Sequence, residues 1–416
     1  MRILAISLAD DSRRFARGFP PKGAKLLLNP DLEIAGLMSQ AGSDQFAYQD
    51  ERVEVLDLKV PFDLALLSTD FWQESRIREV VQEIRDRGAR SVLFGPVATA
   101  KHHELQAVAD SLVQGNVLNV WPRLRADAAE NRLQPLYVAA PTPAYSVPDL
   151  LRTRKPGFDS SFQCLRAALG CFCPAAVQPF CRQYLYHQGL RRYRDLDELT
   201  GEVYDLRHKH VYLLDEDVAQ EPAFYREFFA RVWHYRREWT VLSGARVFDD
   251  VPYLRLLAKA GVRVMILTES WLNQERLAEA AHNRRRARLL RNQVRLLHRQ
   301  RMLVGARISL FLEPGQEFDF KGIYKLLARL SLDFLFIRTF SGSAPGSAVP
   351  KFVAYQPGLL ADKPTWWKNQ FYGLDAIAWR SLRRIVRVGF YTTFRHYYPR
   401  SFAYRQNFLE GIAYPP

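Results

Sequence analysis

The sequence has few cysteines: four among 416 residues, and all four lie between positions 164 and 181. It also lacks an apolar run of the roughly 18–20 residues that a membrane-spanning helix needs, so no membrane span is predicted. The opening stretch MRILAISLADD has a short apolar core ended by two aspartates, and no small-residue cleavage site follows. We expect a buried strand there and not a signal peptide. These absences predict a cytoplasmic protein, in which disulfides are rare and clustered thiols favour metal or redox chemistry.

Acidic residues are fewer than basic ones, 44 against 59, which gives a formal net charge of +15. Nucleic acid, an acidic membrane surface or an anionic ligand could each use this charge. Eight arginines lie in the segment 284–301, where leucines and a valine at helical spacing favour a helix with an arginine-rich outer face. Because no recognisable nucleic-acid-binding fold accompanies this segment, we predict a solvated basic surface and no nucleic-acid partner.

The first 140 residues alternate short apolar runs with helical patterns. We predict strands at 2–9, 53–58, 63–69 and 91–96, a helix at 76–88, and a short helix followed by a strand within 103–115. Strands that alternate with helices imply a parallel sheet covered on both faces, so residues 1–140 are expected to form a doubly wound, Rossmann-like domain. Ligands of such folds bind at the carboxyl ends of the strands. The candidate binding residues there are Ser68, Thr69, Gly95 and Gly115.

A stretch rich in proline and polar residues, 141–160, is the predicted linker, and a second β/α series follows it. We predict strands at 162–167, 210–217, 238–247, 263–270, 304–315 and 332–340, with helices at 195–206, 223–236, 249–261, 284–301 and 320–330. About six successive β/α units predict a partial (β/α)6 barrel of the TIM type over residues 161–345. The remaining residues, 346–416, are dense in aromatics and arginine and are expected to pack on the barrel.

Polar side chains gather where the predicted barrel strands end, which is where barrel enzymes place their chemistry. The candidates are the cysteine loop after the first strand and then Asp215, Glu216, Asp217, Ser243, Arg246 and Glu269. Some have an ordinary structural explanation as well: Asp217 is placed to cap a helix, and Glu269 to pair with an arginine. We expect thiolates, carboxylates and arginines around one mouth.

The order of these parts resembles the cobalamin-binding radical S-adenosylmethionine proteins. PTPAYSVPDLL (141–151) resembles the family's linker, VYLLDEDVAQEPAFYREFF (211–229) its second barrel strand with an acidic turn, and YLRLLAKAGVRVMILTESW (253–271) a later stretch that ends in ES. The resemblance implies methyl transfer, or a related radical step, on a small-molecule substrate. It implies a [4Fe–4S] cluster, S-adenosylmethionine and cobalamin as cofactors. An electron-donor protein and a second family member are the expected partners.

The resemblance also implies roles for the candidate residues. Asp215, Glu216 and Asp217 occupy the acidic turn that contacts the amino group of S-adenosylmethionine, where carboxylates suit an ammonium group. Ser243 and Arg246 are expected near its carboxylate or ribose. Cobalamin is implied by the resemblance alone, because the D-x-H-x-x-G motif that supplies a histidine to cobalt in some cobalamin proteins is absent.

The cysteine loop, GCFCPAAVQPFC, departs from the family's pattern. The family spacing is C-x3-C-x2-C, in which three thiolates hold the cluster, whereas Cys171, Cys173 and Cys181 are spaced C-x-C-x7-C. Three alternatives follow: a cluster bound in an altered way with Cys164 or a carboxylate as a replacement ligand, a single metal ion such as zinc, or a lost site. The last alternative makes the protein a degenerate family member that acts as a binding or partner protein.

Overall fold

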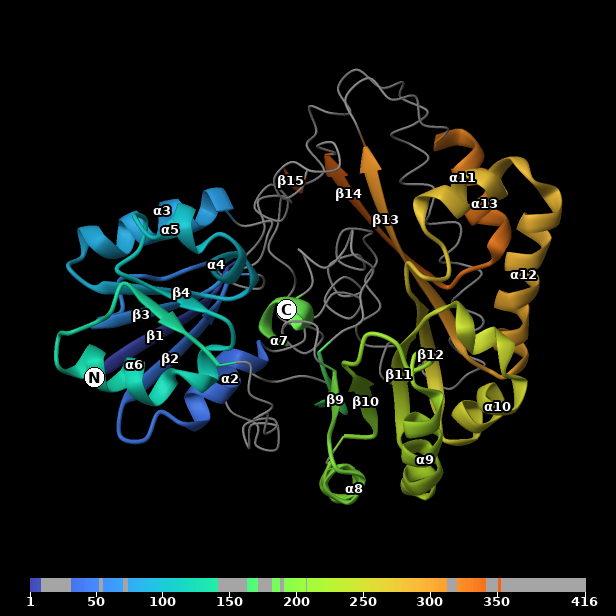
Figure 1. Cartoon of the computed structure of the whole chain (residues 1–416), viewed down its shortest axis with the longest axis horizontal. Helices are drawn as coiled ribbons and strands as arrows, with labels where there is room; N and C mark the ends of the chain where they lie inside the picture. Colours follow the sequence, from blue (N-terminus) through green and yellow to red (C-terminus); the bar gives the residue numbers. More distant parts are fainter. Residues whose placement is uncertain are drawn as a thin grey trace. The chain divides into compact units, whose positions relative to one another are not determined.

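The structure of the protein is a computed structural model. It describes residues 1–8, 31–51, 55–69, 74–140, 163–170, 182–187, 191–206, 208–312, 320–341 and 351–352. The chain divides into two compact units: the first holds Met1–Ser160 with Ala168–Tyr193, and the second holds Ser161–Ala167 with Arg194–Pro415. Each unit has a parallel sheet of its own (Figure 1). The domain boundaries given by the sequence stay predictions.

The sheet of the first unit has six parallel strands in the order β2-β1-β3-β4-β5-β6. Its strands are β1 (Arg2–Ser7), β2 (Gln45–Asp50), β3 (Leu64–Ser68), β4 (Arg90–Phe94), β5 (Ser111–Gln114) and β6 (Leu136–Val138). Its helices are α2 (Leu32–Ser39), α3 (Glu74–Asp86), α4 (Pro96–Ala100), α5 (His102–Leu105), α6 (Trp121–Ala129) and α7 (Arg182–His187). A small antiparallel pair, β8 (Ala168–Leu169) and β9 (Arg192–Tyr193), belongs to the same unit.

Helices cover both faces of this first sheet. One core joins strand residues such as Ile3 to α2 and α6, and the other joins strand residues such as Leu4 to α3, α4 and α5. Neighbouring residues of a strand point to opposite faces, so strands that are apolar at every position are buried on both sides. The parallel sheet with two helix layers that the sequence predicts for this part is therefore confirmed.

The prediction of a strand at 53–58 is wrong. Its described residues, 55–58, form no strand, and Val55 is 68% exposed. The edge position beside β1 is taken instead by β2, QFAYQD, whose side chains are mostly exposed or half-buried. A polar edge strand carries a weak hydrophobic signal, whereas VEVLDL has the apolar alternation that is typical of a strand. The three-residue strand β6 is likewise not predicted.

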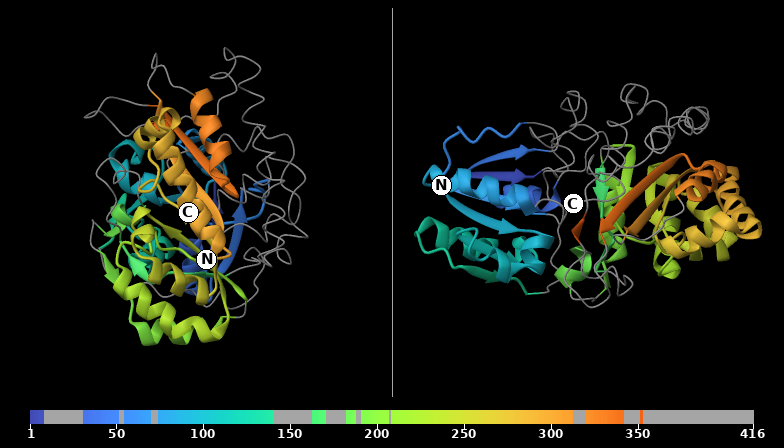
Figure 2. Two further views of the ribbon diagram at one scale, coloured as in Figure 1. Left: turned by 90° about the vertical axis from the view of Figure 1, so that its right-hand side faces the viewer. Right: turned by 90° about the horizontal axis from the view of Figure 1, so that it is seen from above.

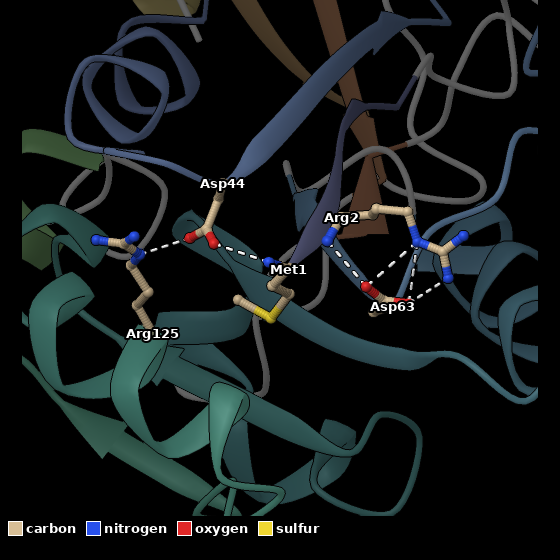
Figure 3. Close-up of polar contacts among 5 residues, drawn as sticks. All are labelled: Met1, Arg2, Asp44, Asp63 and Arg125. Atoms are coloured by element: carbon tan, nitrogen blue, oxygen red, sulfur yellow. Dashed lines mark hydrogen bonds and ion pairs between the residues drawn. The ribbon is translucent and has the colours of Figure 1, made fainter.

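Ion pairs join the start of β1 to the residues just ahead of β2 and β3 (Figure 3). The amino group of Met1 contacts Asp44 Oδ1 at 2.9 Å, and Arg125 of α6 contacts the other oxygen of that carboxylate at 2.5 Å. The backbone N–H and the guanidinium of Arg2 both donate to Asp63, just ahead of β3. These hydrogen bonds from Arg2 lower the pKa of the Asp63 carboxyl to about 2. The first strand is thereby held at its beginning on both sides.

The sheet of the second unit has the order β7-β10-β11-β12-β13-β14-β15, and only the β14–β15 pair is antiparallel. Its strands are β7 (Gln163–Leu165), β10 (His210–Leu213), β11 (Glu238–Ser243), β12 (Val262–Leu267), β13 (Leu303–Leu312), β14 (Phe334–Ser341) and β15 (Lys351–Phe352). Its helices are α8 (Leu196–Asp205), α9 (Pro222–Val232), α10 (Val251–Lys259), α11 (Gln274–His282), α12 (Arg284–Arg299) and α13 (Phe320–Leu330).

The parallel strands of this sheet follow one another in chain order, with helices between successive strands from β10 onward. Figure 2 shows these helices along one side of the sheet. The order is that of successive β/α units, so an α/β fold with parallel sheets is confirmed, and closure into a partial TIM-type barrel stays a prediction. The predicted linker 141–160 lies outside the described residues, as does the extension 346–416 apart from β15. In the described part of the chain, no helix is long and apolar enough to cross a membrane.

Candidate active site

The second sheet has one face toward the helices and one inner face away from them. Trp239 of β11 packs edge-on against Phe228 and Phe229 of α9, with ring centroids 5.6 and 5.7 Å apart. Because side chains alternate along a strand, Val241 and Ser243 point to the helix side as well. Thr240 and Leu242 therefore lie on the opposite face, which we call the inner face.

Strand register extends the inner face across the sheet. Thr240 is paired with Tyr212 and Val264, and Tyr212 is paired with Cys164 of β7. Partners in a parallel ladder share a face, so these four side chains lie on the inner face together. On β13, Leu303 is the partner of Val264, and alternation along the strand then brings residue 307 to the same face. The inner face thus joins side chains from five strands.

Arg307 is the centre of a charged cluster on this face. Its guanidinium contacts Glu216 Oε2 at 3.1 Å, just after β10, and Glu269 Oε2 at 2.8 Å, just after β12. The Arg307 side chain is 12% exposed, and the carboxylates are 28% and 23% exposed. Two carboxylates and one guanidinium have a formal net charge of −1, and solvent still reaches both carboxylates. We call these three residues the Glu216–Arg307–Glu269 cluster.

Beside the cluster, two buried groups of the inner face, Tyr212 and Cys164, are uncharged. Burial raises the pKa of Tyr212 well above its ordinary value, and the negative charge of Glu216 adds to this effect. Burial also raises the pKa of the Cys164 thiol to about 12, although Arg166 opposes the shift. Both groups therefore keep their protons at neutral pH. The charges near them come from the cluster and from the buried Arg166.

Two of the predicted carboxylates are engaged by the protein's own backbone. Asp215 is buried and accepts hydrogen bonds from the Ala167 N–H at 3.2 Å and the Tyr225 hydroxyl at 3.0 Å. It therefore ties the end of β7 to α9. Asp217 accepts from the backbone N–H of Gly244 and of Ala219, each at 2.8 Å. These are structural contacts, and the prediction that both acids bind a cofactor stays untested.

The strand end after β11 is closely packed. A Cβ atom on Gly244 would overlap the Ser270 hydroxyl and the Asp217 carboxylate, so the chain requires glycine at this position. Ser243 is fully buried on the helix side, and its hydroxyl lies 3.5 Å from the Gly244 carbonyl oxygen. Arg246, in the 3-10 helix Ala245–Asp249, has an exposed side chain. Of the residues predicted for this mouth, the structure thus brings together Glu216 and Glu269.

Arg307, the residue that joins them, is not among the predicted site residues. The predicted residues of this mouth follow the ends of strands, whereas Arg307 lies within β13. A usable signal was present in VGARISLFL, where a single arginine interrupts an apolar strand. A charged side chain in a buried strand needs a partner, and the acids at neighbouring strand ends are the candidates for it.

The predicted binding residues of the first unit serve its own packing. The Thr69 hydroxyl donates to the Phe94 carbonyl at 2.6 Å and accepts from the Ala98 N–H at 3.2 Å. Gly95 has φ +110°, and a Cβ atom there would overlap the Thr69 carbonyl oxygen. At Gly115 a Cβ atom would lie 3.0 Å from that of Ala139. Ser68 is buried at the end of β3. The close approach of protein segments accounts for these residue types, and a ligand role stays a prediction.

The cysteine loop lies outside the described residues, including Cys171, Cys173 and Cys181. Among the residues that the structure does describe, no group of three or more His, Cys, Asp or Glu side chains could hold a metal ion. Cys164 lies on β7, buried and protonated, which suits a core side chain better than a thiolate ligand.

No protein-family model matches the sequence, and no curated protein matches it either. Two solved structures with a similar fold are of the radical S-adenosylmethionine methyltransferase TsrM from Kitasatospora setae. One, with a tryptophan substrate and the S-adenosylmethionine analogue aza-SAM bound, is 14% identical with a TM-score of 0.55, covering 81% of this chain and 72% of that one. The other, with cobalamin and a [4Fe–4S] cluster bound, is 13% identical with a TM-score of 0.54, covering 82% and 75%. At this identity the likeness is one of fold.

Proposed function

We propose that the protein is a cobalamin-binding radical S-adenosylmethionine-like enzyme that transfers a methyl group, or carries out a related radical modification, on a small molecule. The observation that carries the proposal is the Glu216–Arg307–Glu269 cluster at the strand ends of a parallel sheet. A fold similar to TsrM over about four-fifths of the chain supports it. The order of sequence segments supports the same family.

The cluster fits the amino-acid end of S-adenosylmethionine. The carboxylates are 28% and 23% exposed, so an ammonium group can reach them, and the guanidinium between them holds both in position. When bound, S-adenosylmethionine supplies a methyl group or a 5′-deoxyadenosyl radical. In this proposal Glu216 and Glu269 bind the ammonium group, and Arg307 orients both carboxylates. Tyr212, which keeps its proton, adds no charge to the site.

The residues described fit the other two cofactors less well. Cys164 does not suit an iron ligand, because its thiol is buried with a pKa of about 12. A [4Fe–4S] cluster would therefore depend on the loop cysteines Cys171, Cys173 and Cys181. In the first unit, Thr69 and Gly95 are engaged in packing the strand ends. Cobalamin binding rests on the likeness of fold, so no step is derived through either group.

Binding of S-adenosylmethionine tests the role of the cluster. Glu216→Gln and Glu269→Gln remove one negative charge each from the site and keep the side-chain shape. We expect each to weaken binding, measured by isothermal titration calorimetry on anaerobically reconstituted protein, by about tenfold or more, the equivalent of about 1.4 kcal/mol. Glu275→Gln, at an exposed position in the first turn of α11, is the matched control. Unchanged affinity in both cluster variants would remove the site from the proposal.

A second candidate function is a binding or partner protein without an iron–sulfur cluster. The C-x-C-x7-C spacing favours it, and so does the unsuitability of the fourth cysteine, Cys164, as a replacement ligand. In that case the fold and the charged cluster would be kept for binding. Metal analysis distinguishes the two candidates, because they differ in iron content.

A further inference from the structure

Helix α12 (Arg284–Arg299) carries seven arginines and no acidic residue. It packs beside α11 and α13 in the helix layer of the second unit (Figures 1 and 2). Its inward side is set by Val294 and Leu297, both fully buried. The helix is thus a structural part of the unit, and its arginines lie where they do not disturb the core.

The arginines of α12 form a stripe on its outer side. Arg284, Arg288, Arg295 and Arg299 are exposed and Arg291 is half-buried. Their separations of four, seven, eleven and fifteen residues from Arg284 keep them within about one third of the helix circumference. At 1.5 Å per residue, the stripe is about 22 Å long. We call these five residues the arginine stripe.

No acidic side chain of α12 or α13 balances this charge. In the described part of the chain, α12 has one arginine in an ion pair, Arg286 with Glu279 at 2.9 Å. Arg286 lies off the stripe. The neighbouring helix α13 adds exposed Lys325 and Arg329, and it has no aspartate or glutamate. The outer side of α12 and α13 is therefore a surface of one sign.

We propose that the arginine stripe binds the phosphate backbone of a nucleic-acid duplex. Such a backbone carries one charge per roughly 1.7 Å of its axis, so a stripe about 22 Å long faces more than enough phosphates for five arginines. Backbone binding requires neither base-edge contacts nor a recognition fold, because its affinity comes from displaced counterions. This inference is independent of the reaction proposed above, and it reverses the sequence-based expectation of no nucleic-acid partner.

The composition of the stripe favours a duplex over the other polyanions. A stable protein interface needs an apolar centre, and a membrane-surface helix needs an apolar face to insert. On α12 the apolar side is buried in the unit, and Leu289 is its one exposed large hydrophobic residue among those described. Single strands are held by aromatic stacking, and α12 has no phenylalanine, tyrosine or tryptophan. The stripe therefore offers charge at regular spacing, which suits the phosphates of a duplex.

A salt titration tests this inference. The probes are labelled DNA and RNA duplexes of about 20 base pairs, with binding to the whole chain measured by fluorescence anisotropy from about 50 to 200 mM salt. The variant Arg288→Gln/Arg295→Gln/Arg299→Gln removes three stripe charges. Glutamine is a good helix former, so the helix should be kept. We expect the variant to bind at least about tenfold more weakly and to lower the slope of log affinity against log salt by about 3. DNA and RNA used side by side show which duplex is preferred.

The matched control is Arg78→Gln/Arg87→Gln/Arg255→Gln, which removes the same charge from exposed positions elsewhere. We expect it to change the salt slope by less than one third as much. Circular dichroism establishes that both triple variants keep their fold. The proposal is overturned if the whole chain does not bind either duplex at the lowest salt, or if the two triple variants lose the same affinity. It is equally overturned if the stripe variant loses binding only to phosphatidylserine vesicles, since the surface would then be a membrane site.

Discussion

Arg307 is the residue on which the proposed site depends most. It lies inside β13, yet it contacts carboxylates that follow β10 and β12. Its chemistry explains why an arginine is tolerated in a largely apolar strand: two nitrogens of its guanidinium group, Nε and Nη2, each have an acidic partner. Removal of such a partner leaves two neighbouring carboxylates without their shared cation.

We expect Arg307→Met to lower the free energy of unfolding by roughly 1–3 kcal/mol, because the carboxylates of Glu216 and Glu269 then lose a partly buried charged partner. Urea unfolding followed by circular dichroism measures the change. Arg307→Lys keeps the charge without the forked geometry, so its free energy of unfolding should lie between those of Arg307→Met and the natural protein. A methionine variant as stable as the natural protein would show that the cluster does not hold the strand ends together.

Glu238 gives a prediction for pH dependence. Its carboxylate contacts Lys209 at 2.6 Å and His210 at 3.0 Å. Burial opposes its ionisation, but the polar contacts with these two residues outweigh burial and lower the pKa of Glu238 to about 2. A carboxyl pKa lower in the folded than in the unfolded chain stabilises the fold above about pH 4.3, and that stability is lost as the pH falls toward 2.

Glu238→Gln should therefore be less stable than the natural protein at pH 7, by about 1 kcal/mol once solvent screening is allowed for. The difference should shrink steadily between about pH 4 and 2. Urea unfolding at neutral and acid pH measures both values, with Glu275→Gln as the control for a surface glutamate. A stability gap that is independent of pH would mean that Glu238 acts through packing and not through its charge.

At the scale of single elements, the turn from β4 into α4 decides how the strand ends of the first unit are built. Gly95 has φ +110°, and its missing side chain allows the Thr69 backbone to approach. Gly88 also has a positive φ, +72°, but nothing lies within 4 Å of the position that its Cβ would take. The two glycines share unusual backbone angles and differ in their surroundings.

Gly95→Ala should lower the free energy of unfolding by more than about 2 kcal/mol, because strain and a clash with the Thr69 carbonyl add together. Gly88→Ala should cost only about 1 kcal/mol, the price of the backbone conformation alone. Thermal or urea unfolding without any cofactor compares the two. Equal effects would argue that Gly95 is not required for packing, which would strengthen its predicted role beside a ligand.

Elements with a strong apolar pattern were predictable from sequence, and elements defined by their neighbours were not. The helix at 320–330 agrees with α13 residue for residue, because its apolar residues recur at helical spacing. The polar strand β2 was missed, while 53–58 was predicted as a strand. Pairing to β1 determines which of the two forms a strand, and the residues themselves do not show it.

The site was partly predictable for the same reason. Glu216 and Glu269 were found because residues at the ends of parallel strands meet at one edge of a sheet. Arg307 joins them through a register of neighbouring strands that only the structure provides. Likewise, the helix-side position of Ser243 follows from the packing of Trp239 on α9, which no spacing rule shows.

At the scale of the whole molecule, the likeness to TsrM extends over most of both chains at 13–14% identity. A shared fold supports many chemistries, so the fold alone does not establish a reaction. The cysteine loop departs from the family's spacing, and this departure is compatible both with an enzyme that has an altered cluster and with a protein that has lost it. Iron binding is therefore the property that decides between the two candidate functions.

The most direct measurement is the iron and acid-labile sulfide content of protein purified and reconstituted without oxygen, alongside a Cys181→Ala variant. The proposed enzyme predicts about four irons and four sulfides per chain, lost or much reduced in the variant. If the natural protein holds no more iron than the Cys181→Ala variant, that result would contradict radical chemistry in this chain and leave the binding or partner protein as its function.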